Sequence, residues 1–565
     1  MSALQTRTTD LEGLLGDPYD PQNPCGHDAV LAADERRELP ADAVRALDEW
    51  GFNAELVPAS LGGRLAGTDQ LIRALRPVFR RDAALGLGYG ITNFMAGVNV
   101  WMSGNDEQRR ELAATLLKGG KIAAAYHELG HGNDLLHNEL SADRNDEHFV
   151  ISGRKEVINN AADARHAVVF ARTDAKPGPR SHSLLLVDTS AVAPGLTRLP
   201  RFRTAGMRGC HLSGFDFAGH RVPVDSLIGA PGTAVETALR SFQVTRCVTA
   251  GLGIGGVDAV LAAVLAFAQQ RRLYGGTVAD IPHARAVIAD AFADLMVADA
   301  FTTAAARLLH TAPAHCSKYA ASVKYLVPIL LEDAARSLAV VLGARSFLRS
   351  GEYAIVGKHL RDLPVLGIGH AGGTACLLTV LPQLISLGRL GEGTDTVPAG
   401  TFDTAPLPEL DYSALCLLGR GHDPLVGTLA AQLADLSHAV EPATRALADQ
   451  LRGDLRALLD DARSLPANGC GVDAAPAAFR LAERYALLAA AACCIGVWQA
   501  GRLPATAPDS TWLRALLGRI AVRLGHPTPI DLGRDEALLS ELTSRTAAGL
   551  DFCIDADPVY RPKTP

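Results

Sequence analysis

Residues 126–137, which read YHELGHGNDLLH, decide how the chain is interpreted. They contain the pattern H-E-x-x-H, with His127 and His131 four residues apart and a third histidine, His137, six residues later. On a helix, two histidines at this spacing share one face and bind zinc, while the glutamate between them acts as a base. Such a site requires a helix, so the secondary structure of this stretch distinguishes a zinc site from other uses.

The sequence favours a strand followed by a loop. A β-like, alanine-rich run at residues 122–126 leads into the motif, and Gly130 and Gly132 lie within it. Each glycine weakens a helix by about 1 kcal/mol relative to alanine. A loop with two glycines can instead present several backbone N–H groups as a nest for carbonyl oxygens or a pyrophosphate. We therefore expect a loop here that contacts a bound group, and no metal site.

Length and composition indicate a globular protein of several domains. The 565 residues are 48% apolar and 20% charged, with a formal net charge of −7. Residues 401–565 hold 15 Lys and Arg against 20 Asp and Glu, so nucleic acid is not an expected partner. The N-terminus has no apolar signal core and no segment offers about 20 uninterrupted apolar residues. We expect a cytoplasmic protein without a membrane span.

The hydrophobic period changes from helical to strand-like and back again. The expected fold class is α+β, mainly α, and the expected domains are an N-terminal helical domain (1–120), a middle β-domain (121–232), a helical bundle (233–400) and an additional helical domain (401–565). Within the first domain, residues 1–37 are predicted to be a loose arm with one short helix, and residues 52–63 an extended stretch. Residues 391–412, rich in Gly, Thr and Pro, are predicted to be a linker.

Several motifs follow one another in a fixed order within residues 35–390. They read GNDEQ at 104–108, AYHELGHGND at 125–134, GRKEVINN at 153–160, GMRGC at 206–210, FAQQRRLYG at 267–275 and RD at 361–362. In this order and spacing they resemble the motifs of the acyl-CoA dehydrogenase family. The additional C-terminal helical domain resembles that of the very-long-chain branch of the family.

The resemblance implies a cofactor, a substrate and an assembly. The cofactor would be FAD, and the substrate an acyl thioester of CoA or of an acyl carrier protein. A homodimer or homotetramer is expected, because family members share the flavin site across subunits. Carried over to this chain, the cofactor-binding residues would be Tyr126, His127, Gly132, Asn133, Asn159, Arg271, Tyr274 and Gly343.

The chain departs from the family at several of these positions. Asn159 stands where the family has a Thr that faces flavin N5, and Val157 where it has a Trp that covers the ring. Asn133 replaces a phosphate-binding Ser. Arg271, which reaches a neighbour's pyrophosphate in the family, is kept. Asparagine can still hydrogen-bond to a flavin, so these changes weaken cofactor binding without excluding it.

The usual catalytic carboxylate is missing. The family glutamate that takes the α-proton lies eight residues after the aspartate of the R-D pair, and counting from Asp362 reaches His370. Some members carry the base just before an arginine that matches Arg246, and this chain has Thr245 there. An unperturbed imidazole is a competent base at neutral pH. We predict His370 and Arg246 as catalytic residues; a structural role for His370, and a relocated base at Glu392 in the linker, remain open.

Residues 251–256, GLGIGG, match the dinucleotide-binding pattern G-x-G-x-x-G. They lie inside an apolar helical run with no strand before them, so the context that the pattern requires is missing. Close packing of helices is the expected role of these glycines.

Two classes of function remain open. The first is an FAD-dependent, acyl-CoA dehydrogenase-like oxidoreductase that acts on an acyl thioester in specialised metabolism with an atypical base. The second is a protein of the same fold that has lost α,β-dehydrogenation and works as a non-redox enzyme, such as a cyclase or lyase, or as a binding protein. The fold cannot choose between them, whereas the presence or absence of flavin can.

Overall fold

The computed structural model describes residues 3–190, 193–369, 371–439, 441–466, 468–503, 510–527 and 531–562. The chain forms two compact units, and both are built from segments that lie far apart in the sequence. Unit 1 comprises Met1–Asp20, Gly67–Arg81 and Arg246–Pro565, and unit 2 comprises Pro21–Ala66 and Asp82–Thr245.

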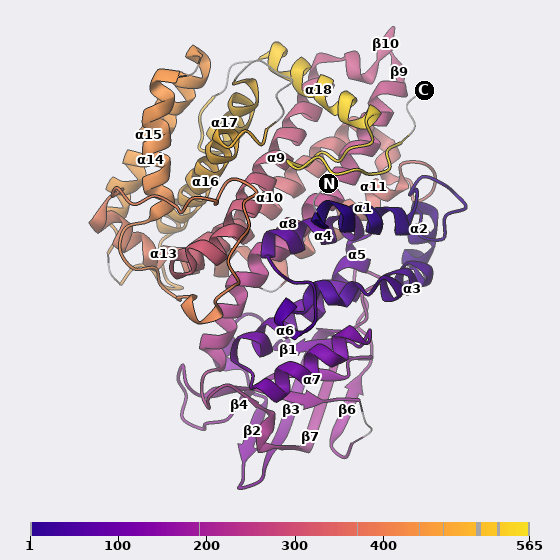
Figure 1. Ribbon diagram of the computed structural model, residues 1–565, viewed down its shortest axis with the longest axis vertical. Coiled ribbons are helices and arrows are strands. Elements are labelled where there is room, and N and C mark those ends of the chain that lie inside the picture. Colours follow the sequence, from indigo (N-terminus) through magenta and orange to yellow (C-terminus); the bar gives the residue numbers. More distant parts are fainter. Residues whose placement is uncertain are drawn as a thin grey trace. The chain divides into compact units, whose positions relative to one another are not determined.

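Unit 2 contains the β-sheet (Figure 1). Its strands are β1 (Ile122–Ala125), β2 (Ser141–Arg144), β3 (His148–Asn159), β4 (His166–Arg172), β5 (His182–Asp188), β6 (Leu196–Leu199), β7 (Leu212–Pro223) and β8 (Leu227–Ile228). Their order is β6-β7-β3-β2-β4-β5-β8, and β1 pairs in parallel with β4. The long strands β3 and β7 run antiparallel, with breaks in register. Phe149, Phe215 and Phe217 belong to the apolar core of this sheet.

The helices of unit 2 begin and end where local sequence signals place them. They are α2 (His27–Arg36), α3 (Ala41–Trp50), α5 (Ala83–Leu85), α6 (Thr92–Ser103) and α7 (Asp106–Leu117), with short 3₁₀ turns at η1 (Phe52–Leu56), η2 (Ala59–Leu61), η4 (Leu135–His137) and η5 (Val224–Ser226). Gly51 ends α3 in the left-handed conformation, with φ 72°. A capping box begins α7: the Gln108 amide donates to Asn105 Oδ1 at 2.8 Å and the Asn105 amide donates to Gln108 Oε1 at 3.1 Å.

A π-helix, η3 (Gly86–Ile91), joins α5 to α6. Its sequence, GLGYGI, allows close contacts that a side chain would block. A Cβ on Gly88 would lie 3.0 Å from the Cys210 sulfur, and one on Gly90 would lie 2.6 Å from the Phe52 ring. Single π-helical turns inside α-helices are frequent at functional sites because they release backbone carbonyls from the regular pattern.

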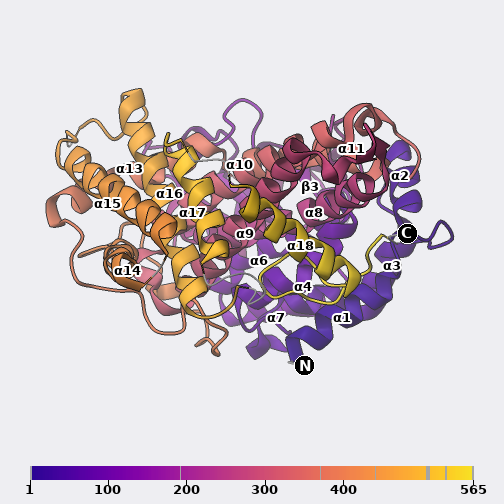
Figure 2. The same ribbon diagram turned by 90° about the horizontal axis from the view of Figure 1, so that it is seen from above.

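Unit 1 is helical. Its helices are α1 (Ala3–Leu15), α4 (Thr68–Arg81), α8 (Ala234–Gln270, from Arg246 onward), α9 (Pro282–Thr311), α10 (Cys316–Leu342), α11 (Ala354–Asp362), α12 (Val365–Ile368), α13 (Gly373–Leu390), α14 (Pro424–Ala439), α15 (Pro442–Arg463), α16 (Pro476–Gln499), α17 (Thr511–Arg523) and α18 (Leu532–Ala547), with 3₁₀ turns at η6 (Val278–Asp280), η7 (Pro313–His315), η8 (Gly343–Phe347) and η9 (Tyr412–Ala414). Helices α9 and α10 pack along each other, and α13, α15, α16 and α17 lie side by side (Figure 2). The predicted linker precedes η9 without helix or strand over residues 391–411.

The glycines of the G-x-G-x-x-G pattern pack against neighbouring helices, as expected. A Cβ on Gly255 would lie 2.6 Å from the Arg76 carbonyl oxygen of α4, and one on Gly251 would lie 2.5 Å from Thr302 of α9. The pattern therefore reflects close backbone approach between helices.

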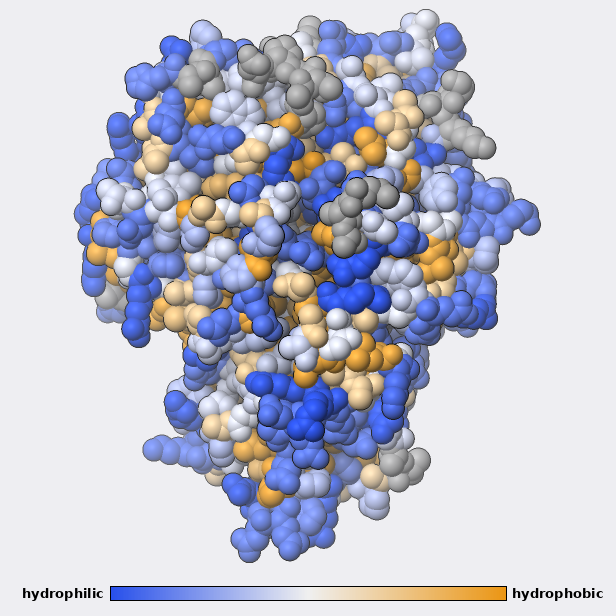
Figure 3. Space-filling model, viewed as in Figure 1, coloured by the Kyte–Doolittle hydropathy of each residue, from blue (hydrophilic) through white to orange (hydrophobic). Residues whose placement is uncertain are grey.

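Within the described ranges, three stretches are long and apolar enough to cross a membrane by length and composition alone, whereas the sequence-based expectation was a protein without a membrane span. They lie in Ala234–Gln270, Ala354–Leu390 and Pro476–Gln499, and their apolar windows are 100%, 35% and 83% buried within the protein. On the face in Figure 3, hydrophobic residues form small groups among hydrophilic ones. Most of the apolar surface of the first and third stretches is therefore buried by protein.

Two local predictions were wrong. Residues 1–37 form two helices, α1 and α2, because Leu11, Leu15 and Val30 are fully buried in tertiary contacts that composition does not reveal. The stretch predicted to be extended at residues 52–63 forms the 3₁₀ turns η1 and η2. Gly51, in the left-handed conformation, turns the chain at the end of α3, and Phe52 is buried directly after it in η1.

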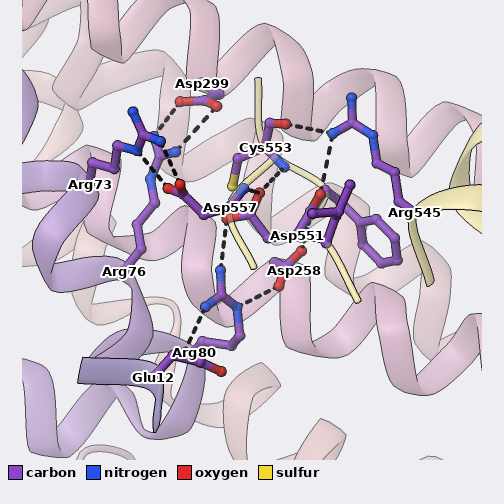
Figure 4. A network of polar contacts seen from close by, with 12 residues as sticks. Glu12, Arg73, Arg76, Arg80, Asp258, Asp299, Arg545, Asp551, Cys553 and Asp557 are labelled. Carbon is purple, nitrogen blue, oxygen red and sulfur yellow. Dashed lines mark hydrogen bonds and ion pairs between the residues drawn. The ribbon is translucent and has the colours of Figure 1, made fainter. Parts of the chain in front are cut away.

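A buried network of charges holds unit 1 together (Figure 4). Its centre is Asp258, in the middle of α8, whose side chain is fully buried. The Asp258 carboxylate accepts hydrogen bonds from Arg80 Nε at 2.6 Å, from Arg561 Nη2 at 2.8 Å and from the Phe552 amide at 2.8 Å. Burial alone would raise the pKa of Asp258, but Arg561 and Arg80 lower this pKa to about 2.

The C-terminal segment, residues 550–562, supplies the other members of this network. Arg73 Nε of α4 donates to Asp557 Oδ2 at 2.6 Å, and the Ile554 amide donates to Asp299 Oδ2 of α9 at 2.8 Å. Asp551 is also buried and lies 3.0 Å from Arg80. The segment thus joins α4, α8 and α9 through charges that are removed from water.

Replacing Asp258 by Asn should strongly destabilise unit 1. The variant keeps the shape of the side chain but leaves the Arg80 and Arg561 charges buried with one partner fewer. Breaking a buried charge pair in this way costs about 3–5 kcal/mol. The measurement is thermal unfolding followed by circular dichroism, with exposed Asp473→Asn as the control. Equal melting temperatures for D258N and the wild type would contradict this account.

Candidate functional site

The predicted cofactor-binding residues fall in both units. Tyr126, His127, Gly132 and Asn133 lie in the loop that follows β1 of unit 2, and Asn159 lies at the end of β3. Arg271, Tyr274 and Gly343 belong to unit 1.

The loop of unit 2 is anchored by a buried ion pair. The carboxylate of Glu128 lies 2.7 Å from Lys155 Nζ and accepts from the amides of Glu139 at 2.8 Å and Leu140 at 3.1 Å. Lys155 is fully buried, and burial lowers its pKa to about 8 although Glu128 opposes the change. Burial would raise the pKa of Glu128, but Lys155 and the two amides hold that pKa below its ordinary value. Glu128 therefore ties the two ends of the loop together.

The backbone of this loop is not the open nest that the sequence suggested. The amides of His131 and Gly132 donate to the Glu128 carbonyl at 3.1 and 2.9 Å. The Asp134 amide donates to the His131 carbonyl at 3.0 Å. These N–H groups are used inside the turn because Gly132, with φ 58°, bends the chain back on itself. That expectation was wrong for these three amides.

The side chains of the loop have different surroundings. The Tyr126 hydroxyl donates to Asn99 Oδ1 at 2.8 Å, and its ring packs against Phe170 in the core of unit 2. His127 Nδ1 donates to the Glu156 carbonyl at 3.0 Å, and Asn133 is exposed. Residues 127–131 are not helical, so the H-E-x-x-H residues do not share a helix face. Across the described ranges, no three His, Cys, Asp or Glu residues are grouped to hold a metal ion.

Asn159 docks on the π-helix with a defined orientation. Its Nδ2 donates to Thr92 Oγ1 at 2.7 Å and approaches the Leu87 and Gly88 carbonyls at 3.4 and 3.3 Å. The Thr92 hydroxyl in turn donates to the Leu87 carbonyl at 2.8 Å, so Thr92 can only accept from Asn159. This fixes the amide, and its oxygen Oδ1 is buried with no donor from any described residue. A buried acceptor in this state is completed by a donor from a bound group or from an ordered water.

A strained residue sits just before Asn159. Val157 has φ 58°, in the left-handed region that a β-branched residue rarely enters, at a register shift between Glu156 and Ile158. Strained positions of this kind cluster at functional sites. Sequence reasoning missed both Val157's geometry and the partner Thr92. The one available signal was the glycine-rich run at residues 86–90.

The residues of unit 1 lie on exposed elements. Arg271 precedes a two-strand hairpin, β9 (Arg272–Leu273) and β10 (Gly276–Thr277), whose turn holds Tyr274 and Gly275 at φ 54° and 90°. Tyr274 is 95% exposed at the tip. Gly343 ends α10 with φ 63°, and it is exposed as well.

The predicted catalytic residues are only partly described. His370 lies outside the described residues. Arg246 is buried in α8, and its Nη1 donates to Thr379 Oγ1 of α13 at 3.4 Å. Thr245 is buried and donates to the Ser241 carbonyl, whereas Glu392 is exposed in the linker. In the sequence, the two expected base positions hold His370 and Thr245, and neither is a carboxylate.

Comparison with known proteins identifies the family. Three family models match: the N-terminal domain of acyl-CoA dehydrogenase over residues 27–120, the middle domain over 123–219 and the C-terminal domain over 235–381. The chain belongs to the acyl-CoA dehydrogenase family. Its fold is that of the family, with N-terminal, middle and C-terminal domains followed by additional C-terminal helices.

Individual relatives are distant. The mitochondrial short-chain specific acyl-CoA dehydrogenase of Bos taurus is 30% identical over 278 residues, which are 49% of this chain and 66% of that protein. An acyl-CoA dehydrogenase of Bacillus anthracis, solved with FAD, superposes with a TM-score of 0.71 at 15% identity over 96% of this chain and 95% of its own. The prolyl acyl carrier protein oxidase AnaB superposes with a TM-score of 0.58 at 16% identity, over 67% of this chain and 98% of its own. These structural likenesses concern the fold.

The family implies FAD, and unit 2 fits it at one point that the geometry defines. The orphaned Asn159 Oδ1 requires a hydrogen-bond donor, and the N–H of an isoalloxazine ring or a ribityl hydroxyl would supply one. The amide nitrogen of Asn159, Nδ2, already donates to Thr92. Asn159 would therefore offer the cofactor a hydrogen-bond acceptor and not a donor.

Replacing Asn159 by Ala should weaken FAD binding by about 10- to 100-fold, the cost of one hydrogen bond to a buried group. Quenching of flavin fluorescence on titration into apoprotein measures the dissociation constant. The control is Asn145→Ala. It removes an exposed asparagine side chain in the turn between β2 and β3, and this side chain makes none of the contacts of Asn159. Unchanged affinity in N159A would rule out this contact.

Replacing Glu128 by Gln should destabilise unit 2 at neutral pH, because Lys155 loses its buried counter-charge. The folded-state pKa of Glu128 lies below its ordinary value of 4.5. Its charge therefore contributes stability above that value, and the contribution is lost as the pH falls through the folded-state pKa. Melting temperatures should differ at pH 7 and converge in acid. Glu147→Gln, at an exposed position, should match the wild type throughout.

Proposed function

We propose that this protein is an FAD-dependent oxidoreductase that acts on an acyl thioester, carried by CoA or by an acyl carrier protein, in specialised metabolism. Membership of the acyl-CoA dehydrogenase family supports the reaction class. The observation that carries the proposal is the buried, orphaned Asn159 Oδ1 beside the π-helix. The flavin supplies hydride acceptance when it is bound.

The residues of the chain have separate tasks in this proposal. Asn159 accepts a hydrogen bond from the cofactor, and the Glu128–Lys155 pair holds the loop of residues 127–140 in place. Arg246, a buried cation, favours negative charge that develops on the thioester oxygen. The α-proton must go to a base other than a carboxylate at the two usual positions, which makes the base atypical.

The acyl group could be carried by CoA or by an acyl carrier protein, and two observations bear on this choice. The net charge of −7 does not favour an acidic carrier protein over CoA. The likeness in fold to a prolyl acyl carrier protein oxidase makes a carrier-bound amino acyl group one member of the substrate panel.

We also propose a homodimer or homotetramer. Exposed apolar side chains support it: Val340 is 77% exposed, Phe347 88% and Leu348 57%, all at the end of α10 or in the turn after it. Such side chains are usually covered in an assembly. Light scattering after gel filtration measures the mass, and a monomer at micromolar concentration would contradict this part of the proposal.

The test of the function is the visible spectrum of the purified protein, before and after incubation with FAD. A flavin band is expected. Anaerobic addition of butyryl-CoA, isovaleryl-CoA, glutaryl-CoA or prolyl-loaded carrier protein should then bleach it for at least one thioester. Absence of flavin after reconstitution would overturn the redox function.

That negative outcome would favour the second function. The lack of a carboxylate at the usual base positions supports a protein that kept the fold and lost dehydrogenation. It would then act as a non-redox enzyme, such as a cyclase or lyase, or as a binding protein.

A further inference from the structure

Four lysines are buried within the described ranges, and three of them have a carboxylate partner. The Nζ–O distances are 2.7 Å for Lys155–Glu128, 3.0 Å for Lys318–Asp423 and 2.8 Å for Lys358–Asp362. This is the usual arrangement, because lysine is almost never fully buried unless its charge is paired. Lys324, on α10, is 1% exposed and has no such pair among the described carboxylates.

The surroundings of Lys324 favour the neutral amine. Its Nζ donates to the backbone carbonyl of Leu366 in α12. Burial lowers the pKa of Lys324 to about 8, the Cys376 thiol opposes the change, and the positive charge of Arg246 adds to it. About a tenth of the amine is then unprotonated at pH 7, compared with well under a thousandth for an ordinary lysine.

Lys324 lies close to the segment in which the family carries its catalytic base. Leu366 lies between Asp362 and the position eight residues later where the family carries its catalytic glutamate. Lys324 reaches the same segment from α10. Arg246, whose charge acts on Lys324, also contacts Thr379 of α13. A proton acceptor and a fixed cation thus lie close to the segment that lacks the carboxylate.

We propose that Lys324 is the base that removes the α-proton of the acyl thioester, in place of the missing carboxylate. The inference rests on the proposed function. In this step the Cα–H bond breaks, an N–H bond forms on Nζ, and the electron pair stays on the substrate as an enolate. Burial, with a smaller contribution from Arg246, raises the share of neutral amine before the transfer, and Arg246 stabilises the enolate after it. The step consumes no oxidant, so it can be observed apart from flavin reduction.

The direct test is exchange of the α-proton for deuterium. FAD-loaded protein is incubated in D₂O with each thioester of the panel above, and mass spectrometry follows the label. Lys324→Met and Lys324→Arg should slow exchange at least about 100-fold, since general base catalysis contributes on that scale. The matched control is Lys318→Arg, on the same helix, which keeps its ion pair with Asp423 and should stay within about threefold of the wild type.

The outcomes separate the base from the redox function. Exchange at the wild-type rate in K324M overturns the inference, even if the flavin is still bleached. Exchange by the wild type that K324M loses, without any bleaching, supports Lys324 and overturns the redox function. Neither exchange nor bleaching by the wild type overturns both.

A second measurement needs no substrate. Between the folded-state pKa of about 8 and the ordinary value of 10.5, only the unfolded chain holds the proton of Lys324, so wild-type stability rises with pH in that window. K324M does not bear the cost of burying a protonated amine, so its melting temperature at pH 7 should equal or exceed that of the wild type. The difference in melting temperature should narrow toward pH 10.5. A K324M variant that melts well below the wild type at pH 7 would identify Lys324 as a structural cation and overturn the inference.

Discussion

The rule that a buried charge needs a partner organises unit 1. Asp258 lies in the middle of the apolar helix α8, and it remains ionised there because Arg80 and Arg561 surround it. These arginines come from α4 and from the C-terminal segment, so one carboxylate joins parts of the chain that are hundreds of residues apart. The same rule recurs at Asp299, which accepts from Arg76 and from the amide of Ile554. Hydrophobic burial brings the helices together, and these pairs connect α4, α8 and α9 to the C-terminal segment.

The exceptions to this rule mark the chemistry. Asn159 has a buried oxygen to which no described residue donates, near a strained valine and a π-helix. Lys324 has a buried amine that pairs with no carboxylate in the described part of the chain, and it feels the charge of Arg246. The buried carboxylates Glu128, Asp362 and Asp423 each have a lysine partner. A buried amine that lacks such a partner, and a buried amide oxygen beside a strained backbone, are therefore candidates for contact with a ligand.

The sequence predicted what depends on local patterns. The capping box at Asn105 and the family motifs follow from spacing along the chain. It missed what depends on distant contacts: α1 forms because Leu11 and Leu15 are buried in the tertiary structure, and strands β2 and β6 are too short and polar to stand out. The candidate site was harder still. The orientation of Asn159 is set by Thr92, which lies 67 residues earlier in the chain. Lys324 is distinguished by the lack of a carboxylate partner among the described residues, which only the folded structure reveals.

The discontinuous make-up of unit 1 has a consequence for biosynthesis. Helix α4 is made early, yet Arg73 and Arg80 meet Asp557 and Asp551 only after most of the chain has been synthesised. Until residues 550–562 have left the ribosome, Arg73 lacks Asp557 and Arg80 lacks one of its carboxylates, so the contacts of α4 within unit 1 stay incomplete. Unit 1 therefore completes its folding late, and the nascent chain exposes the apolar faces of α8 and α9 for longer than a contiguous domain would.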